Sequence, residues 1–143
     1  MSMFFPRILV AYDGSVYAKK ALAIACKLSR VFGSKLRIIH VIDTTHIGLM
    51  VSGTGVVFVK TVVEKGRSII AEARELAKRH GVDAEVVLRR GHPADEIVRE
   101  AREWKADLIV MGSKGLGGFE KLLVGSVSDS VVRLAPCPVL VVR

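Results

Sequence analysis

The chain has 143 residues, half of them hydrophobic, and its 22 Lys and Arg residues exceed its 14 Asp and Glu residues, which gives a formal net charge of +8. This length and apolar content suit a single domain, 1–143, with a substantial core, and they exclude disorder as a description of the whole chain. We expect a cytoplasmic protein that makes no contact with membranes, because no apolar run is long enough to cross a bilayer, no signal peptide is evident and two cysteines are too few for a disulfide scaffold.

The excess of positive charge raises the question of nucleic-acid binding. Basic residues are scattered along the chain and often lie beside acids, as in Glu64-Lys65 and Arg99-Glu100, and no basic run alternates with aromatic residues. We therefore predict no nucleic-acid partner. A solvated basic surface of this kind would still favour an anionic small ligand.

The hydrophobic periodicity predicts five strands that alternate with four helices. Short continuous apolar runs, which are typical of strands buried on both faces of a parallel sheet, are expected at 7–12, 35–42, 84–88, 108–111 and 138–142. Apolar residues at helical spacing predict helices over 18–32, 59–80, 93–104 and 126–134, the third of them starting at Gly91-His92-Pro93. The segment from Asp43 to Gly55 has no clear period and is expected to be a loop.

This alternation predicts an open parallel sheet with helices on both faces. In such sheets a ligand binds at the carboxyl ends of the strands, where the strand order reverses. If the first and fourth strands are neighbours at the centre, Ala11-Tyr12-Asp13 and Met111-Gly112 line one crevice, and Val41 flanks it.

The segment 108–127 carries the most specific signal in the chain. A buried strand is followed by a cluster of glycines and two lysines, and a second glycine, followed by serine, then begins a segment with helical spacing. These residues are Gly112, Gly115, Gly117 and Gly118, Lys114 and Lys121, and Gly125-Ser126. A strand that leads through glycines to a helix N-terminus presents backbone N–H groups to an anion, with Ser126 expected as the N-cap. The pattern favours a phosphate cradle, and the alternative is a flexible connecting loop.

Several common motifs are absent. Neither the Walker A pattern GxxxxGK[ST] nor the dinucleotide pattern GxGxxG occurs. Ser113 and Ser126 lie outside any GxSxG sequence, and the four histidines lack the spacing of metal ligands. We therefore assign no catalytic residue.

The motif formed by Gly112, two residues, Gly115, nine residues and Gly125-Ser126 resembles the ATP-binding motif of the universal stress protein family. The segments RILVAYDGS, GHPADEI, ADLIVMGSKG and APCPVLVVR are similar to other parts of that family, so the resemblance extends over nearly the whole chain. It implies a single five-stranded α/β domain of the adenine nucleotide alpha hydrolase-like type, with strand order 3-2-1-4-5. In the ATP-binding branch of the family it also implies a bound adenine nucleotide.

The resemblance further implies roles for individual residues. Gly112 and Gly115 would lie against the ribose and phosphates, and Val41 would offer its backbone to the adenine edge. The outer phosphates would be held by backbone N–H groups and a hydroxyl, and the remaining contacts would come from the ends of the first and fourth strands. The residues that hold the outer phosphates would be Gly125, Ser126 and Val127, and those at the strand ends would be Ala11, Tyr12, Asp13 and Met111.

Asp13 has two interpretations. An aspartate after a strand and before Gly14-Ser15 is a natural turn and helix-capping residue. Beside a triphosphate its carboxylate would be repelled unless a cation or a ribose hydroxyl lies between them. We therefore predict Mg²⁺ or Mn²⁺, held mainly by phosphate oxygens and water, with Asp13 as the protein ligand.

The last strand predicts a homodimer. Pro136 and Pro138 cannot donate ladder hydrogen bonds, which places Val139 to Val142 at a sheet margin. Two copies that pair antiparallel through this apolar edge would form a closed two-fold dimer, which the family resemblance also implies. The alternative is a short edge strand shielded by its own flanking helix.

Three functions follow from these features. The first is an ATP-binding protein of the stress response that acts as a nucleotide-dependent homodimeric switch, read by a protein partner that the sequence does not identify. The second is an ATPase that is slow or activated by a partner, and the third is a nucleotide-free dimeric interaction module.

Overall fold

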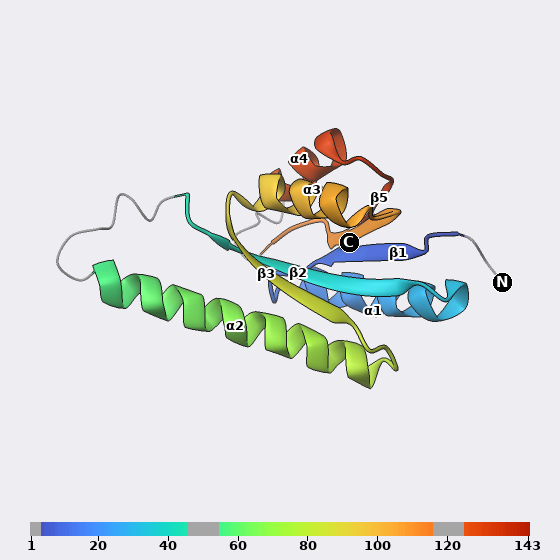
Figure 1. Cartoon of the computed structure of the whole chain (residues 1–143), viewed down its shortest axis with the longest axis horizontal. Helices are drawn as coiled ribbons and strands as arrows, with labels where there is room; N and C mark the ends of the chain where they lie inside the picture. Colours follow the sequence, from blue (N-terminus) through green and yellow to red (C-terminus); the bar gives the residue numbers. More distant parts are fainter. Residues whose placement is uncertain (1–3, 46–54, 116–124) are drawn as a thin grey trace.

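The computed structural model describes residues 4–45, 55–115 and 125–143, and a five-stranded parallel sheet forms its centre (Figure 1). The strands are β1 (Arg7–Ala11), β2 (Lys35–Asp43), β3 (Glu85–Gly91), β4 (Leu108–Gly112) and β5 (Val139–Val142). Their order is β3-β2-β1-β4-β5, so the predicted order is confirmed. The order reverses between β1 and β4, whose register pairs Ala11 with Met111.

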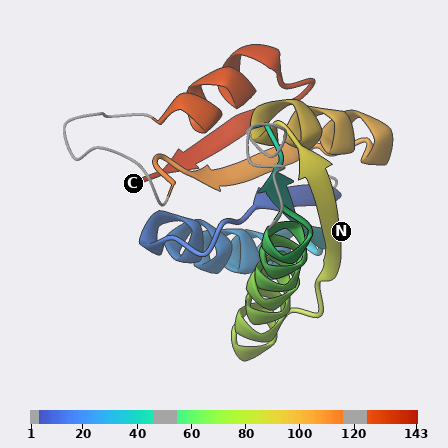
Figure 2. The same ribbon diagram turned by 90° about the vertical axis from the view of Figure 1, so that its left-hand side faces the viewer.

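Helices cover both faces of the sheet, as the alternation predicts. They are α1 (Val16–Phe32), α2 (Gly55–Arg79), α3 (Pro93–Trp104) and α4 (Ser126–Leu134). Figure 2 shows α1 and α2, in blue and green, on one face and α3 and α4, in orange and red, on the other. Among the helices of the described residues, none is both long and apolar enough to cross a membrane.

The pleat of β1 divides the core into two layers. Ile8 and Val10 point into the layer beneath α1 and α2, whereas Leu9 and Ala11 point into the layer beneath α3 and α4. Burial of each of the larger side chains, Ile8, Leu9 and Val10, stabilises the fold by about 1.5–3 kcal/mol relative to an exposed one. A continuous apolar run is therefore what a central strand of this sheet requires.

A capped turn connects β1 to α1 and forms part of the edge where the strands end. Asp13 Oδ1 accepts a hydrogen bond from the Ser15 N–H at 2.9 Å, and the Ser15 hydroxyl oxygen accepts one from the Ala18 N–H at 3.1 Å. Ser15 is the N-cap of α1. The prediction that Asp13 is a turn residue therefore holds, whereas the helix cap is Ser15 and not Asp13.

Most predicted boundaries agree with the structure to within two residues, and two differ by more. The second helix begins at Gly55 rather than at residue 59, and β3 runs to Gly91 rather than to residue 88. Gly91, predicted as part of a helix start, is the last residue of β3 because its pairing with Asp43 extends the β2–β3 ladder. His92 is the N-cap of α3, and Pro93 occupies its first turn. Pairing with β2 thus determines where β3 ends, and local periodicity does not report such pairing.

Candidate functional site

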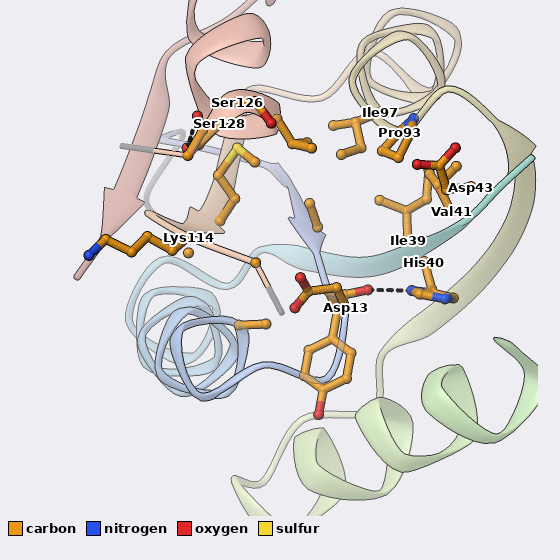
Figure 3. A pocket seen from close by; sticks show the side chains of 18 residues that line it. Asp13, Ile39, His40, Val41, Asp43, Pro93, Ile97, Lys114, Ser126 and Ser128 are labelled. Carbon is orange, nitrogen blue, oxygen red and sulfur yellow. Dashed lines mark hydrogen bonds between the residues drawn. The ribbon is translucent and has the colours of Figure 1, made fainter. Parts of the chain in front are cut away.

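A pocket of about 580 Å³ opens where the carboxyl ends of β1, β2 and β4 meet the starts of α3 and α4 (Figure 3). All ten site residues predicted from the sequence line it. They are Ala11, Tyr12, Asp13, Val41, Met111, Gly112, Gly115, Gly125, Ser126 and Val127. The pocket thus lies at the point where the strand order reverses, as expected for an open α/β sheet.

One end of the pocket is an apolar slot. Ile39 and Val41 are two residues apart on β2, so their side chains lie on the same face of the sheet, toward α3. Pro93 and Ile97 are four residues apart on α3 and present one face of that helix to the same space. Figure 3 shows these four residues gathered on one side of the pocket. Such a slot suits a flat apolar group, for example a heteroaromatic ring.

The other end of the pocket is suited to an anion. The nine-residue helix α4 begins at Ser126, and its N-cap Gly125 has extended backbone with φ −74° and ψ 168°. Among the described residues no side chain caps this helix, and its first residues line the pocket, so its first N–H groups and its dipole are directed there. Lys114 lies beside this end, with its amine directed away from the pocket and 5.9 Å from the centre of the Tyr17 ring, and Asp13 lies between the two ends in Figure 3. The prediction that Ser126 is the N-cap is wrong by one residue, because Gly125 takes the extended conformation of the cap.

Hydrogen bonds of Ser113 connect the start of α4 to the end of β4. Its carbonyl oxygen accepts hydrogen bonds from the Gly125 N–H at 2.5 Å and from the Ser128 hydroxyl at 2.9 Å. Its own N–H donates to the Val142 carbonyl of β5 at 2.7 Å. Ser128 is buried, so its hydroxyl holds the position of the helix N-terminus against the strand.

Two glycines of the motif lie in close contact with other parts of the protein. A Cβ atom at Gly112 would lie 2.7 Å from Tyr17 Cβ and 2.8 Å from the Tyr17 carbonyl carbon, so glycine here lets α1 pack against β4. A Cβ atom at Gly115 would lie 2.6 Å from Asp13 Oδ2. The carboxylate of Asp13 therefore occupies the space that a side chain at Gly115 would need.

Two buried side chains hold the end of β1 from the opposite face of the sheet. The Tyr12 hydroxyl donates to Glu72 Oε1 on α2 at 2.9 Å, and the His40 Nδ1–H donates to the Tyr12 carbonyl at 2.8 Å. Burial, together with the Glu72 carboxylate, raises the pKa of Tyr12 well above its usual range. Burial lowers the pKa of His40 and outweighs the opposite effects of the Tyr12 carbonyl and Asp13. The His40 imidazole is therefore neutral at pH 7.

Some predicted features of the loops lie outside the described residues. These are Gly117, Gly118 and Lys121 of the glycine segment, and residues 46–54 of the predicted loop. Over the residues that are described, no group of three or more His, Cys, Asp or Glu side chains is arranged to hold a metal ion. A site built from protein ligands alone therefore does not fit the described part of the pocket.

Sequence reasoning missed most of the pocket's apolar wall and two of its polar supports. The missed lining residues are Ala18, Ile39, His40, Asp43, Pro93, Ile97 and Ser128. Ile39 could have been predicted as a lining residue, because it lies two residues before Val41 on β2 and therefore on the same face of the sheet. The roles of His40 and Ser128 depend on carbonyl groups of other elements, and no local pattern signals such contacts.

Comparison with known proteins identifies the family. The sequence profile of the universal stress protein family matches residues 5–143. A universal stress protein of Thermus aquaticus is 41% identical over 142 residues, which cover 97% of this chain and 99% of that protein. The solved structure of the hypothetical protein MJ0577 has a TM-score of 0.87 at 26% identity, covering 98% of this chain and 96% of that one. A universal stress protein solved in complex with cAMP has a TM-score of 0.72 at 29% identity, covering 98% of both chains. This chain belongs to the universal stress protein family.

Proposed function

We propose that the pocket binds an adenine nucleotide, with ATP as the expected ligand, and that the protein is a nucleotide-dependent homodimeric switch of the stress response. One observation carries the proposal: an apolar slot and an uncapped helix N-terminus lie at opposite ends of a single pocket of about 580 Å³. A nucleotide has the same two-part chemistry, because its base is flat and its phosphates are anionic. The relative solved with cAMP supports an adenine nucleotide as the ligand class.

In this proposal each part of the pocket contacts one part of the nucleotide. The adenine lies in the slot between Val41 and Ile97, and its polar edge meets the backbone of Val41. The ribose lies near Asp13, whose carboxylate accepts hydrogen bonds from hydroxyl groups. The phosphates lie at the start of α4, where the N–H groups of Ser126 and Val127 and the charge of Lys114 stabilise them.

A divalent cation fits this proposal only as part of the ligand. Asp13 is a single carboxylate, and its Oδ1 already accepts the Ser15 N–H at 2.9 Å. Mg²⁺ or Mn²⁺ would therefore arrive on the phosphates, keep most of its water and take at most one protein ligand. The ion would neutralise part of the charge between Asp13 and the phosphates.

The edge of the sheet supports the dimer. Over the described residues β5 pairs with β4 alone, and Leu140, Val132 and Leu134 are exposed apolar side chains on and beside this strand. Two copies that pair through β5 would cover this surface and complete the ladder. The backbone of Ser113 is hydrogen-bonded both to Val142 at the proposed dimer edge and to Gly125 at the phosphate end of the pocket. In this proposal, nucleotide binding at Gly125 changes the β5 edge through Ser113, and a partner protein recognises that change.

The decisive variant is Ser126→Pro. Proline is well tolerated as the first residue of a helix, and the extended backbone of Gly125 is compatible with a following proline, so α4 should be preserved. The variant lacks one N–H at the anion end. We expect its Kd for ATP, measured by calorimetry, to rise about tenfold or more, the effect of losing one hydrogen bond to a charged group.

Ser126→Ala is the matched control, because it lacks the hydroxyl but keeps the N–H. Its affinity for ATP should lie between those of the wild type and Ser126→Pro. A wild-type protein with no measurable affinity for ATP, or a Ser126→Pro variant that binds as tightly as wild type, would overturn the proposal.

A further inference from the structure

We propose that His40 is a positioning residue of the nucleotide site. Its imidazole donates a hydrogen bond to the Tyr12 carbonyl, so the backbone N–H of Val41 does not bond that carbonyl and can donate to the base of the ligand. This inference rests on the proposed nucleotide binding and assigns the origin of its base recognition. The His40 side chain lies on the face of the sheet opposite to the apolar slot, where it contacts the Tyr12 carbonyl.

The backbone ladder between β1 and β2 ends next to His40. Its last bond runs from the Tyr12 N–H to the Ile39 carbonyl at 2.9 Å. In a regular parallel ladder the Tyr12 carbonyl would next accept the N–H of the residue two positions beyond Ile39, which is Val41. Here the Tyr12 carbonyl instead accepts the Nδ1–H of His40 at 2.8 Å.

The substitution of a side-chain donor for a backbone donor changes what Val41 can do. Residues two apart on a strand direct their N–H groups to the same side, so the Val41 N–H points toward β1, as the Ile39 carbonyl does. Val41 lines the pocket just beyond the last ladder bond. Its N–H is therefore placed to donate to a ring nitrogen of a base in the slot.

The state of His40 suits this role. The residue is 8% exposed, and its pKa is lowered by burial, so the ring is neutral at pH 7. Because a carbonyl oxygen only accepts, the single ring proton resides on Nδ1. A leucine would fill a similar volume but would leave the buried Tyr12 carbonyl without its donor. That carbonyl would then recover the Val41 N–H and close the ladder over the base edge.

The same bond also sets the peptide that leads to Asp13. The peptide bonds of the described residues are trans, so the Asp13 N–H points opposite to the Tyr12 carbonyl. The carboxylate of Asp13, the next residue, lies against Gly115 beyond the end of β4.

The test compares His40→Leu with His40→Asn, in which the amide nitrogen takes the place of Nδ1 as a donor. Ile38→Val is the control for lost packing, because Ile38 is buried on the same face of β2 but does not line the pocket. ATP and GTP are the probes, since adenine N1 accepts a hydrogen bond whereas guanine N1 carries a proton. We expect His40→Leu to weaken ATP binding about tenfold with little effect on GTP, which corresponds to one lost hydrogen bond in a buried site.

His40→Asn should keep most of the wild-type affinity for ATP, and Ile38→Val should keep the wild-type ratio of ATP to GTP affinity. Equal losses for ATP and GTP in His40→Leu, or an Asn variant as weak as the Leu variant, would overturn the positioning role. Hydrogen exchange of the Val41 amide in the ligand-free protein gives an independent measure. Exchange should slow in His40→Leu, where the ladder closes, and unchanged exchange would also overturn the inference.

These outcomes separate the two proposals. If the wild type does not bind ATP, the proposed function fails, and the exchange rate of the Val41 amide still decides what His40 does to the ladder. If the wild type binds ATP and His40→Leu behaves identically, the proposed function stands and the role of His40 is refuted.

Discussion

The glycines of the motif lie in different local surroundings. Gly112 permits the close approach of α1, and Gly115 leaves space for the carboxylate of Asp13. Gly125 is the extended N-cap of α4. In the proposed function the motif therefore does more than contact a ligand. Its glycines also determine how α1, Asp13 and α4 pack around the pocket.

Gly112→Ala should therefore destabilise the fold with or without a nucleotide. Its methyl group would overlap Tyr17 Cβ and the Tyr17 backbone, and backbone does not yield as a flexible side chain does. We expect the free energy of unfolding, measured by urea denaturation, to fall by about 2 kcal/mol, as in other overpacked cores.

Gly33→Asn is the control for this substitution. A Cβ atom at Gly33 meets no atom within 4 Å, and asparagine tolerates its left-handed backbone, with φ 70°. The control should change stability by less than about 1 kcal/mol. A Gly112→Ala variant as stable as the control would contradict the packing role.

At the scale of elements, a charged network fixes α3 over the sheet. The Glu100 carboxylate of α3 accepts hydrogen bonds from Arg37 of β2 at 2.8 Å and from Arg89 of β3 at 2.9 Å. The guanidinium of Arg37 also lies 4.5 Å from the centre of the Trp104 ring. Because α3 carries Pro93 and Ile97, this network sets one wall of the pocket.

Glu100→Gln should reveal the contribution of the network. The Glu100 side chain is only 6% exposed, so its charge is little screened, and the variant leaves two arginines without their shared carboxylate. We expect a loss of about 2 kcal/mol in the free energy of unfolding, measured by urea denaturation.

The matched control is Glu85→Gln, which breaks an ion pair of Arg37 that has better access to water. The Glu85 side chain is 54% exposed, and exposed pairs contribute less than about 1 kcal/mol. Equal losses in the two variants would show that burial of Glu100 does not determine the stability of α3.

At the scale of the whole molecule, β5 is an edge strand of the sheet that the described residues form, and in the proposed dimer a second copy would cover it. The strand is short and apolar, and Leu140 is 38% exposed upon it. Lysine at such an edge opposes pairing, because association would bury its charge. We expect Leu140→Lys to be a monomer in sedimentation velocity experiments in which the wild type is a dimer.

Val31→Lys is the control, because Val31 is an exposed apolar residue that belongs to α1 and not to β5. It should leave the sedimentation coefficient unchanged. A wild type that sediments as a monomer at all concentrations, or a Leu140→Lys variant that remains a dimer, would exclude pairing through β5.

Much of the architecture and the outline of the site were predictable. The apolar runs of β1 and β4 and the glycines that follow them are local signals, and the rule for parallel sheets places their ends together. The apolar wall was not predictable in the same way. Pro93 and Ile97 belong to a helix more than fifty positions from Ile39 in sequence, and their common pocket depends on how α3 lies over β2.

The sequence by itself determined the succession of strands and helices, the family and the ten residues expected at the crevice, because periodicity and motif spacing depend on near neighbours. Only the tertiary structure decided which groups occupy each other's space. The Asp13 carboxylate fills the position beside Gly115, and the His40 imidazole takes the Tyr12 carbonyl from the ladder. Both contacts join strands that are distant in the chain, and such contacts are set by the register and packing of the sheet, about which local sequence patterns carry no information.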